Sequence, residues 1–155
     1  MRLTLLAVGD KMPGWAEDAT AEYLKRMPRE ARVDLLTVKP EKRSGQPPDS
    51  LKQAEAARLL DKLPTGARLV AMDEHGSQVT TRELAVLLSR WMGSGQDTCL
   101  VIGGADGLAP VILEKAETIL ALSRLTLPHA MARVMLAEQL YRAVSLINNH
   151  PYHRE

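Results

Sequence analysis

Residues 100–108 read LVIGGADGL, an apolar run that passes without a break into three glycines. The apolar half predicts a buried strand, and the glycines after it let the backbone turn sharply or approach a ligand closely. Their spacing is GGxxG, so the dinucleotide-binding fingerprint GxGxxG does not match, and no P-loop lysine follows. The stretch therefore predicts either a ligand-binding loop or a tight strand-to-helix turn that binds nothing.

Strand-like and helix-like segments alternate on both sides of this stretch. We expect strands within residues 2–8, 32–38, 67–72, 98–102 and 118–127. We expect helices over residues 13–27, 51–63, 80–93 and 129–148, and a further helix with Pro110 in its first turn. The alternation predicts an α/β fold, with a mostly parallel sheet flanked by helices, in a single domain of residues 1–155.

Local signals set several of these boundaries. Ser50 with Gln53, and Thr80 with Glu83, have the spacing of capping boxes that open helices. Gly93 or Gly95 should end the helix that Thr80 opens. The segment KPEKRSGQPPDS, residues 39–50, is rich in proline, glycine, serine and charge, so it predicts a mobile loop inside the domain.

The composition limits the class of protein. The chain has 155 residues, of which 45% are hydrophobic and 3% aromatic, and it contains no Phe, so aliphatic residues must fill the core. A lone Cys99 excludes a disulfide framework and is expected to be a small buried residue. The first apolar run is too short for a signal peptide and none approaches a membrane span, so we expect a cytoplasmic protein. The net charge of +1 neither supports nor excludes nucleic-acid binding.

A second loop, SRLTLPHAMAR at residues 123–133, joins the last strand to the long final helix. Pro128 fixes the direction of the chain, and the dipole at the start of the helix disfavours a charged His129. A neutral imidazole there is able to donate or accept a hydrogen bond, or it simply caps the helix. Met131 and Met135 are expected to pack rather than to take part in chemistry.

The chain ends in NNHPYHRE, residues 148–155, which is unusually rich in functional groups for a terminus. The segment either packs as structure or supplies an aromatic face, imidazoles and a positive charge to a site. Glu138 and Arg142 are spaced for an ion pair on the preceding helix. His150 and His153 lack a third ligand in suitable spacing, so no metal site is expected.

Three stretches together carry a resemblance: LVIGGADGL, LSRLTLPHAMARVMLAEQLYRA and NNHPYHRE, in this order and at this distance from the end. With the N-terminal LLAVGDKMPGW, they resemble the 23S ribosomal RNA pseudouridine N3-methyltransferases of the SPOUT superfamily over the whole chain. One position departs from the pattern, because Asp106 stands where the family often has glutamate. The resemblance implies a SPOUT-type α/β fold with a deep C-terminal trefoil knot, a homodimer and the cofactor S-adenosyl-L-methionine.

The resemblance also implies roles for particular residues. The cofactor would lie among three loops formed by Met72, Gly103, Gly104, Ser123, Arg124, Leu125, Thr126, Leu127 and Pro128. The catalytic group would comprise His129, Arg142, Tyr152, His153 and Arg154, with the C-terminal tail of one subunit lying over the cofactor of the other. Tyr152 would contact the base, Arg154 its anion or a phosphate, and His129, His150 or His153 would carry the proton.

The implied substrate is a pseudouridine in the helix 69 loop of 23S ribosomal RNA, methylated on the assembled ribosome. Two other functions remain open from the residues alone. A nucleotide-binding α/β enzyme would also use a glycine loop, and bound NAD or a nucleoside triphosphate would identify it. A noncatalytic ribosome-binding factor would keep the RNA surface but bind no cofactor.

Overall fold

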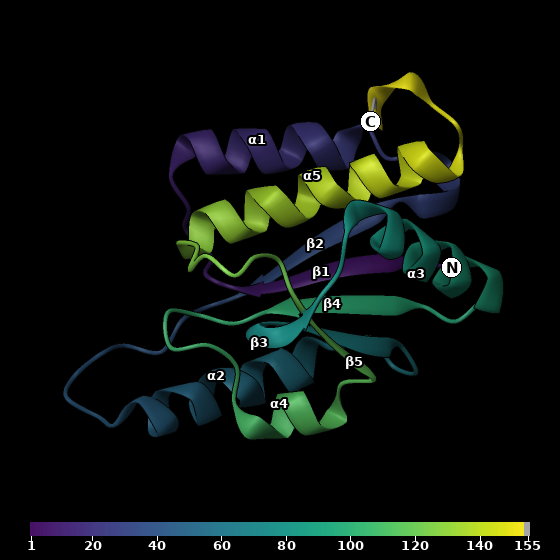
Figure 1. Cartoon of the computed structure of the whole chain (residues 1–155). Coiled ribbons are helices and arrows are strands. Elements are labelled where there is room, and N and C mark those ends of the chain that lie inside the picture. Colours follow the sequence, from purple (N-terminus) through teal and green to yellow (C-terminus); the bar gives the residue numbers. More distant parts are fainter. Residues whose placement is uncertain (154–155) are drawn as a thin grey trace.

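The computed structural model describes residues 1–153, and its central feature is a five-stranded sheet. The strands are β1 (Leu3–Val8), β2 (Val33–Val38), β3 (Arg68–Gln78), β4 (Thr98–Ile102) and β5 (Thr118–Ala121). They lie in the order β2-β1-β4-β3-β5, and every pair of neighbours is parallel (Figure 1). The parallel sheet predicted from the alternating segments is confirmed.

Helices cover both faces of the sheet (Figure 1). The helices are α1 (Gly14–Lys25), α2 (Pro48–Lys62), α3 (Thr81–Ser94), α4 (Pro110–Lys115) and α5 (His129–Ile147), with short 3-10 helices at Arg29–Ala31 and Pro151–His153. One face carries α1, α5 and α3, and the opposite face carries α2 and α4. Each face therefore has its own apolar layer.

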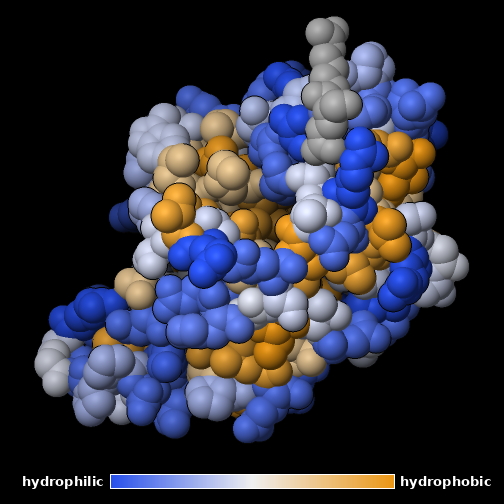
Figure 2. All heavy atoms as spheres, viewed as in Figure 1, coloured by the Kyte–Doolittle hydropathy of each residue, from blue (hydrophilic) through white to orange (hydrophobic). Residues whose placement is uncertain are grey.

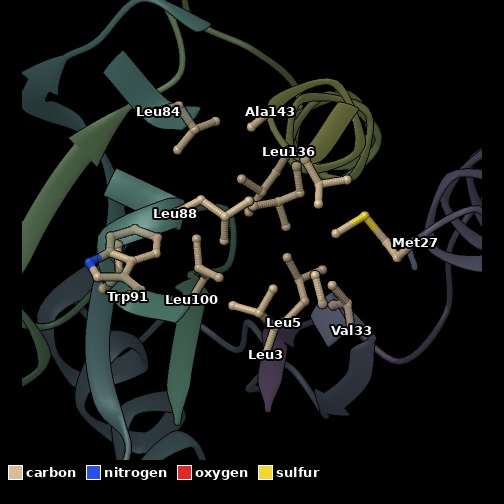
Figure 3. Close-up of a cluster of buried hydrophobic side chains, with 14 of the residues drawn as sticks. Leu3, Leu5, Met27, Val33, Leu84, Leu88, Trp91, Leu100, Leu136 and Ala143 are labelled. Atoms are coloured by element: carbon tan, nitrogen blue, oxygen red, sulfur yellow. The ribbon is translucent and has the colours of Figure 1, made fainter. Parts of the chain in front are cut away.

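The two layers follow from the alternation of side chains along each strand. Leu3 and Leu5 of β1 point to the face of α3 and α5, where they join Leu100 of β4 and Leu140 of α5 (Figure 3). The intervening residues of β1 and β4 point to the other face and pack against α2 and α4: Leu6, Val8, Cys99 and Val101. Both faces are buried, which explains why these strands read as unbroken apolar runs.

Cys99 is fully buried, as predicted, and burial raises the pKa of its thiol to about 12. Thr80 and Glu83 form the predicted capping box, and both of its reciprocal hydrogen bonds are made. The C-cap of α3 is Gly95, which has the left-handed conformation. The prediction that Ser50 and Gln53 form a capping box is wrong. Helix α2 begins at Pro48, so Ser50 already lies in its first turn, because a proline with fixed φ and no N–H suits that position.

Strand β3 is longer than predicted and is interrupted where it passes the end of β5. Leu120 of β5 pairs with both Met72 and Ser77, so residues 73–76 are displaced from the ladder between two pairings. Irregularities of this kind change the direction of side chains next to functional sites. They expose the Asp73–His75 segment at the carboxyl end of the sheet.

Removal of the Thr80 hydroxyl provides a test of the α3 capping box. Thr80→Ala should lower the free energy of unfolding by about 1 kcal/mol, because the Glu83 backbone N–H loses its acceptor. Urea denaturation measures the change, and Ser89→Ala, at an exposed position of the same helix, should stay within about 0.5 kcal/mol. Equal effects of the two substitutions would show that the cap contributes nothing.

Candidate active site

A cavity of about 580 Å³ opens at the carboxyl ends of β3 and β4, beside the segment that follows β5. Three loops form it: the Asp73–His75 segment, the glycine loop 103–108 and the loop 122–127. His129, in the first turn of α5, and Lys52 of α2 close it from either side. Ligands of open α/β sheets bind at this edge, so the position of the cavity agrees with the prediction from sequence.

The glycine loop is both a tight turn and a wall of this cavity. Gly107 N–H donates to the Gly104 carbonyl at 3.0 Å and closes the turn. A Cβ at Gly103 would lie 2.6 Å from the Gly107 carbonyl carbon, and one at Gly104 would lie 3.0 Å from Glu55 Oε1. The two glycines are therefore required by close packing of the loop on itself and on α2.

The segment 39–50 was expected to be a mobile loop, but its last residues belong to α2 and the part before them is tied to the glycine loop and to α2. Arg43 forms an ion pair with Asp106 at 2.9 Å, and the Glu41 carboxylate accepts a hydrogen bond from Arg58. The buried Glu55 accepts the Glu41 backbone N–H at 3.1 Å. Sequence reasoning missed Glu55, although an acidic residue on the apolar face of a helix, one turn after Leu51, was a signal for it.

Of the residues expected to hold the cofactor, seven line the cavity: Met72, Gly103, Gly104, Ser123, Leu125, Thr126 and Leu127. The other two, Arg124 and Pro128, do not line it. Leu125 is 75% exposed at the rim, and its backbone N–H donates to Ser123 Oγ at 2.9 Å. Pro128 is the residue that precedes α5, and it sets the direction of the helix. Lys52, Asp73 and Glu74 also line the cavity and were not predicted.

His129 faces the cavity and does not cap α5, because no side chain makes a cap hydrogen bond at that helix start. Its Nε2 lies 3.0 Å from Nη2 of Arg133, which is itself buried and donates to the Gly9 carbonyl. Burial lowers the pKa of His129 and the positive charge of Arg133 lowers it further, while a hydrogen bond with the Gly103 backbone opposes them. The ring is neutral, as predicted, although the main cause is burial.

A second cluster of functional groups lies at the other end of α5. Glu138 accepts hydrogen bonds from Arg142 Nε at 2.9 Å and from the Tyr152 hydroxyl at 3.1 Å. The Tyr152 ring packs against Tyr141, with ring centroids 4.5 Å apart, and the Arg142 guanidinium lies over its other side. Arg142 also donates to the carbonyl of His153. Residues 152 and 153 therefore dock on the body of the chain, whereas Arg154 lies outside the described residues.

The two clusters are far apart within one chain. The 19 residues of α5 span about 28 Å at 1.5 Å per residue, and they separate His129 from the helix end that holds the tail (Figure 1). The structure thus gathers His129 with the cofactor residues, and gathers Arg142, Tyr152 and His153 elsewhere. It does not bring the two groups together in a single subunit.

Two further features concern the kind of site. Within residues 1–153 no group of three or more His, Cys, Asp or Glu side chains is arranged to hold a metal ion. No helix in that described range is long and apolar enough to cross a membrane.

Known proteins resemble the chain in sequence and in fold. A family model described as "Predicted SPOUT methyltransferase" matches residues 1–153. The large-subunit ribosomal RNA methyltransferase H of Methylobacillus flagellatus is 53% identical, with all of both chains covered, and that of Nitrosospira multiformis is 55% identical over 99% of each.

One solved structure shows the same fold. A probable methyltransferase from Bordetella pertussis superimposes with a TM-score of 0.61 at 19% identity, covering 92% of this chain and 96% of that one. The glycine loop, the loop before α5 and the C-terminal tail, together with these matches over the full length, show that the chain belongs to the family of the large-subunit ribosomal RNA methyltransferases H within the SPOUT methyltransferases.

Proposed function

We propose that this methyltransferase transfers a methyl group from S-adenosylmethionine to N3 of a pseudouridine in the helix 69 loop of 23S ribosomal RNA. We propose further that it acts in the cytoplasm as a homodimer on the assembled ribosome. The observation that carries the proposal is the cavity at the carboxyl ends of β3 and β4, formed by the loops that the family motifs mark. A nucleotide-dependent enzyme or a noncatalytic factor would not account for these motifs together with the docked tail.

The cavity fits the proposed cofactor. Its volume lies within the roughly 300–1,000 Å³ usual for small-molecule sites. Met72, Leu125 and Leu127 offer apolar walls for an adenine ring, and the turn at Gly103 and Gly104 brings backbone polar groups to the lining. Asp106 is paired with Arg43, but the carboxylates of Asp73 and Glu74 still outnumber the one lysine of the lining, Lys52, and favour a cationic ligand. S-adenosylmethionine supplies an activated methyl group on a positively charged sulfur.

A second copy of the chain completes the site in this proposal. Within one chain, α5 separates Tyr152 and His153 from the cavity by nearly its whole length. Apolar side chains are exposed on α1 and on the first half of α5: Trp15, Met131 and Met135. Figure 2 shows hydrophobic surface gathered in patches on one face of the molecule. Leu136, the residue after Met135, is buried in the core of its own chain and cannot belong to this surface. A dimer through α1 and α5 would place each tail near the partner's cavity.

The tail cluster has the groups that the transfer needs. The reaction requires alignment of N3 with the methyl group and loss of the N3 proton. Burial and hydrogen bonds to Tyr23 and Glu138 raise the pKa of Tyr152, so its hydroxyl stays protonated and acts as a donor. His153 Nδ1 is buried and has no hydrogen-bond partner within residues 1–153, which leaves it free to accept a proton. We expect Arg142 and Arg154 to stabilise the negative charge that remains on the base.

Incubation with labelled S-adenosylmethionine tests the function. Free 23S RNA, isolated large subunits and assembled ribosomes are supplied in parallel, and the nucleosides are then separated. We expect label in N3-methylpseudouridine from assembled ribosomes. Label in another nucleoside would reject the proposed target, and the absence of label from all three would reject the reaction.

Gly104→Val provides a test of the cofactor cavity. The branched side chain would press on Glu55 Oε1 and on Val8 Cγ1, 3.0 and 3.2 Å from the new Cβ, and would displace the loop. We expect the affinity for S-adenosylmethionine to fall roughly tenfold or more, as measured by calorimetry. Gly93→Ala, whose Cβ meets nothing within 4 Å, is the control and should bind normally. Unchanged binding of S-adenosylmethionine by a folded Gly104→Val protein would show that the glycine loop does not form part of the cofactor site.

Met135→Glu provides a test of assembly. Half-exposed Met135 lies on the proposed interface of α5, and burying an unpaired carboxylate there would cost more than the contact contributes. Sedimentation at micromolar concentration should show a dimer for the natural protein and for Met135→Leu, and a monomer for Met135→Glu. A natural protein that sediments as a monomer would contradict the shared site.

Deletion of residues 150–155 provides a test of the tail. We expect S-adenosylmethionine binding to persist, because the cavity is formed elsewhere, and methylation to fall by about 10²–10⁴-fold, the usual contribution of positioned acid and base groups. Tyr152→Phe, which keeps the ring on Tyr141 but loses the bond to Glu138, should retain more activity than Tyr152→Ala.

Mixed dimers decide which subunit the tail serves. A dimer of one tail-deleted subunit and one Gly104→Val subunit keeps one intact composite site only if the tail crosses to the partner. About half of the natural activity is then expected, since one of two positioned sites survives. Properly formed mixed dimers without activity would place each tail on its own subunit.

A further inference from the structure

The protonation state of His129 can be deduced from its neighbour. A guanidinium keeps its protons at any working pH and has only donors. Nη2 of Arg133 lies 3.0 Å from Nε2 of His129, which is a hydrogen-bond distance, so Nε2 must be the acceptor. The imidazole is therefore neutral, with its one proton on Nδ1, the atom left to serve the hydrogen bond with the Gly103 backbone.

Arg133 is held in a way that keeps this arrangement in place. The side chain is 3% exposed, forms no ion pair within residues 1–153, and donates from Nη2 to the Gly9 carbonyl at 3.0 Å. A Cβ on Gly9 would lie 3.4 Å from both Arg133 Nη2 and His129 Nε2, so the chain after β1 packs directly on the pair. A positive charge on His129 would be repelled by the neighbouring buried guanidinium of Arg133, which disfavours protonation of the ring.

The contacts join three segments that are distant in sequence. Gly9 follows β1, Gly103 follows the adjacent strand β4, and His129 and Arg133 lie one turn apart at the start of α5. The chain of contacts runs from the Gly9 carbonyl through Arg133 and His129 to the backbone of Gly103. His129 and Gly103 both line the cavity, so this interaction lies at its wall.

We infer that His129 is a positioning residue, a neutral imidazole held by Arg133 in one tautomer so that its ring anchors the glycine loop at the cofactor cavity. It does not carry the proton removed from the base, because its acceptor nitrogen is already occupied by a group that cannot release it. The inference rests on the proposed function only in taking this cavity to be the cofactor site. Proton transfer is then left to groups of the tail.

Nuclear magnetic resonance of histidine-labelled protein tests the tautomer without any variant of the site. The full-length dimer is observed from about pH 8 to about pH 5.5, a range that spans the ordinary histidine pKa of about 6.5. We expect the His129 ring to show a bare Nε2 and a protonated Nδ1 throughout. Exposed His75 serves as the comparison in the same spectra, and His129→Asn identifies the signals. The charged groups that act on the pair are Arg133 itself and Glu17 of α1, which stabilises the guanidinium.

Two substitutions separate positioning from proton transfer. Asparagine offers an oxygen for Arg133 and an N–H for Gly103, so His129→Asn should keep S-adenosylmethionine affinity and methyl transfer within roughly tenfold of the natural protein. Leucine fills similar space without polar atoms, so His129→Leu should lose about tenfold or more in affinity, as one unmade buried hydrogen bond predicts. Rescue by asparagine but not by leucine supports positioning.

Other outcomes overturn the inference. A proton on Nε2, or a ring that titrates near pH 6.5, would contradict the arrangement with Arg133. Normal cofactor binding with a loss of 10²–10⁴-fold in transfer by His129→Asn would identify a proton carrier instead. Normal binding by His129→Leu would show that the ring anchors nothing. Natural protein that fails to bind S-adenosylmethionine would defeat the proposed cavity, while the ring spectra would still decide the tautomer.

Discussion

The packing of α5 on the sheet is the interaction on which the rest of the structure depends. Leu136, Leu140 and Val144 are buried against the apolar face that β1 and β4 present, and α1 and α3 lie on either side of the helix. This contact fixes both ends of α5 at once. The beginning of the helix closes the cavity with His129, and the later turns hold the tail through Glu138 and Arg142.

Features that depend on neighbours in the sequence could be predicted. The strands β1, β2 and β4, the capping box at Thr80 and the pair of Glu138 with Arg142 are set within a few residues, and all were confirmed. The start of α2 was misjudged, because Ser50 has the spacing of a cap while Pro48 suits a first helical turn even better. The trefoil knot of the SPOUT fold could be expected only from the resemblance, since knots are too rare for any local pattern to predict.

Features that depend on distant segments could not be predicted from the residues. Nothing near Glu55 in the sequence shows that its carboxylate lies beneath Gly104, and nothing near Asp73 shows that β3 is interrupted there. Asp106 is a similar case, because its ion pair with Arg43 links residues 63 positions apart. The Asp106 carboxylate reaches that arginine at 2.9 Å, so the acidic residue of this loop has a structural partner.

The docking of Tyr152 and His153 on their own chain has an energetic consequence for the proposed dimer. Within a single chain, Tyr152 is already packed on Tyr141 and hydrogen-bonded to Glu138. Ordering a free terminal segment would cost roughly 1–2 kcal/mol of backbone entropy per residue at the moment of binding. Folding of a single chain has already met that cost for Tyr152 and His153. In the proposed dimer these residues would form a preorganised surface, so arranging them would take little of the free energy of RNA association.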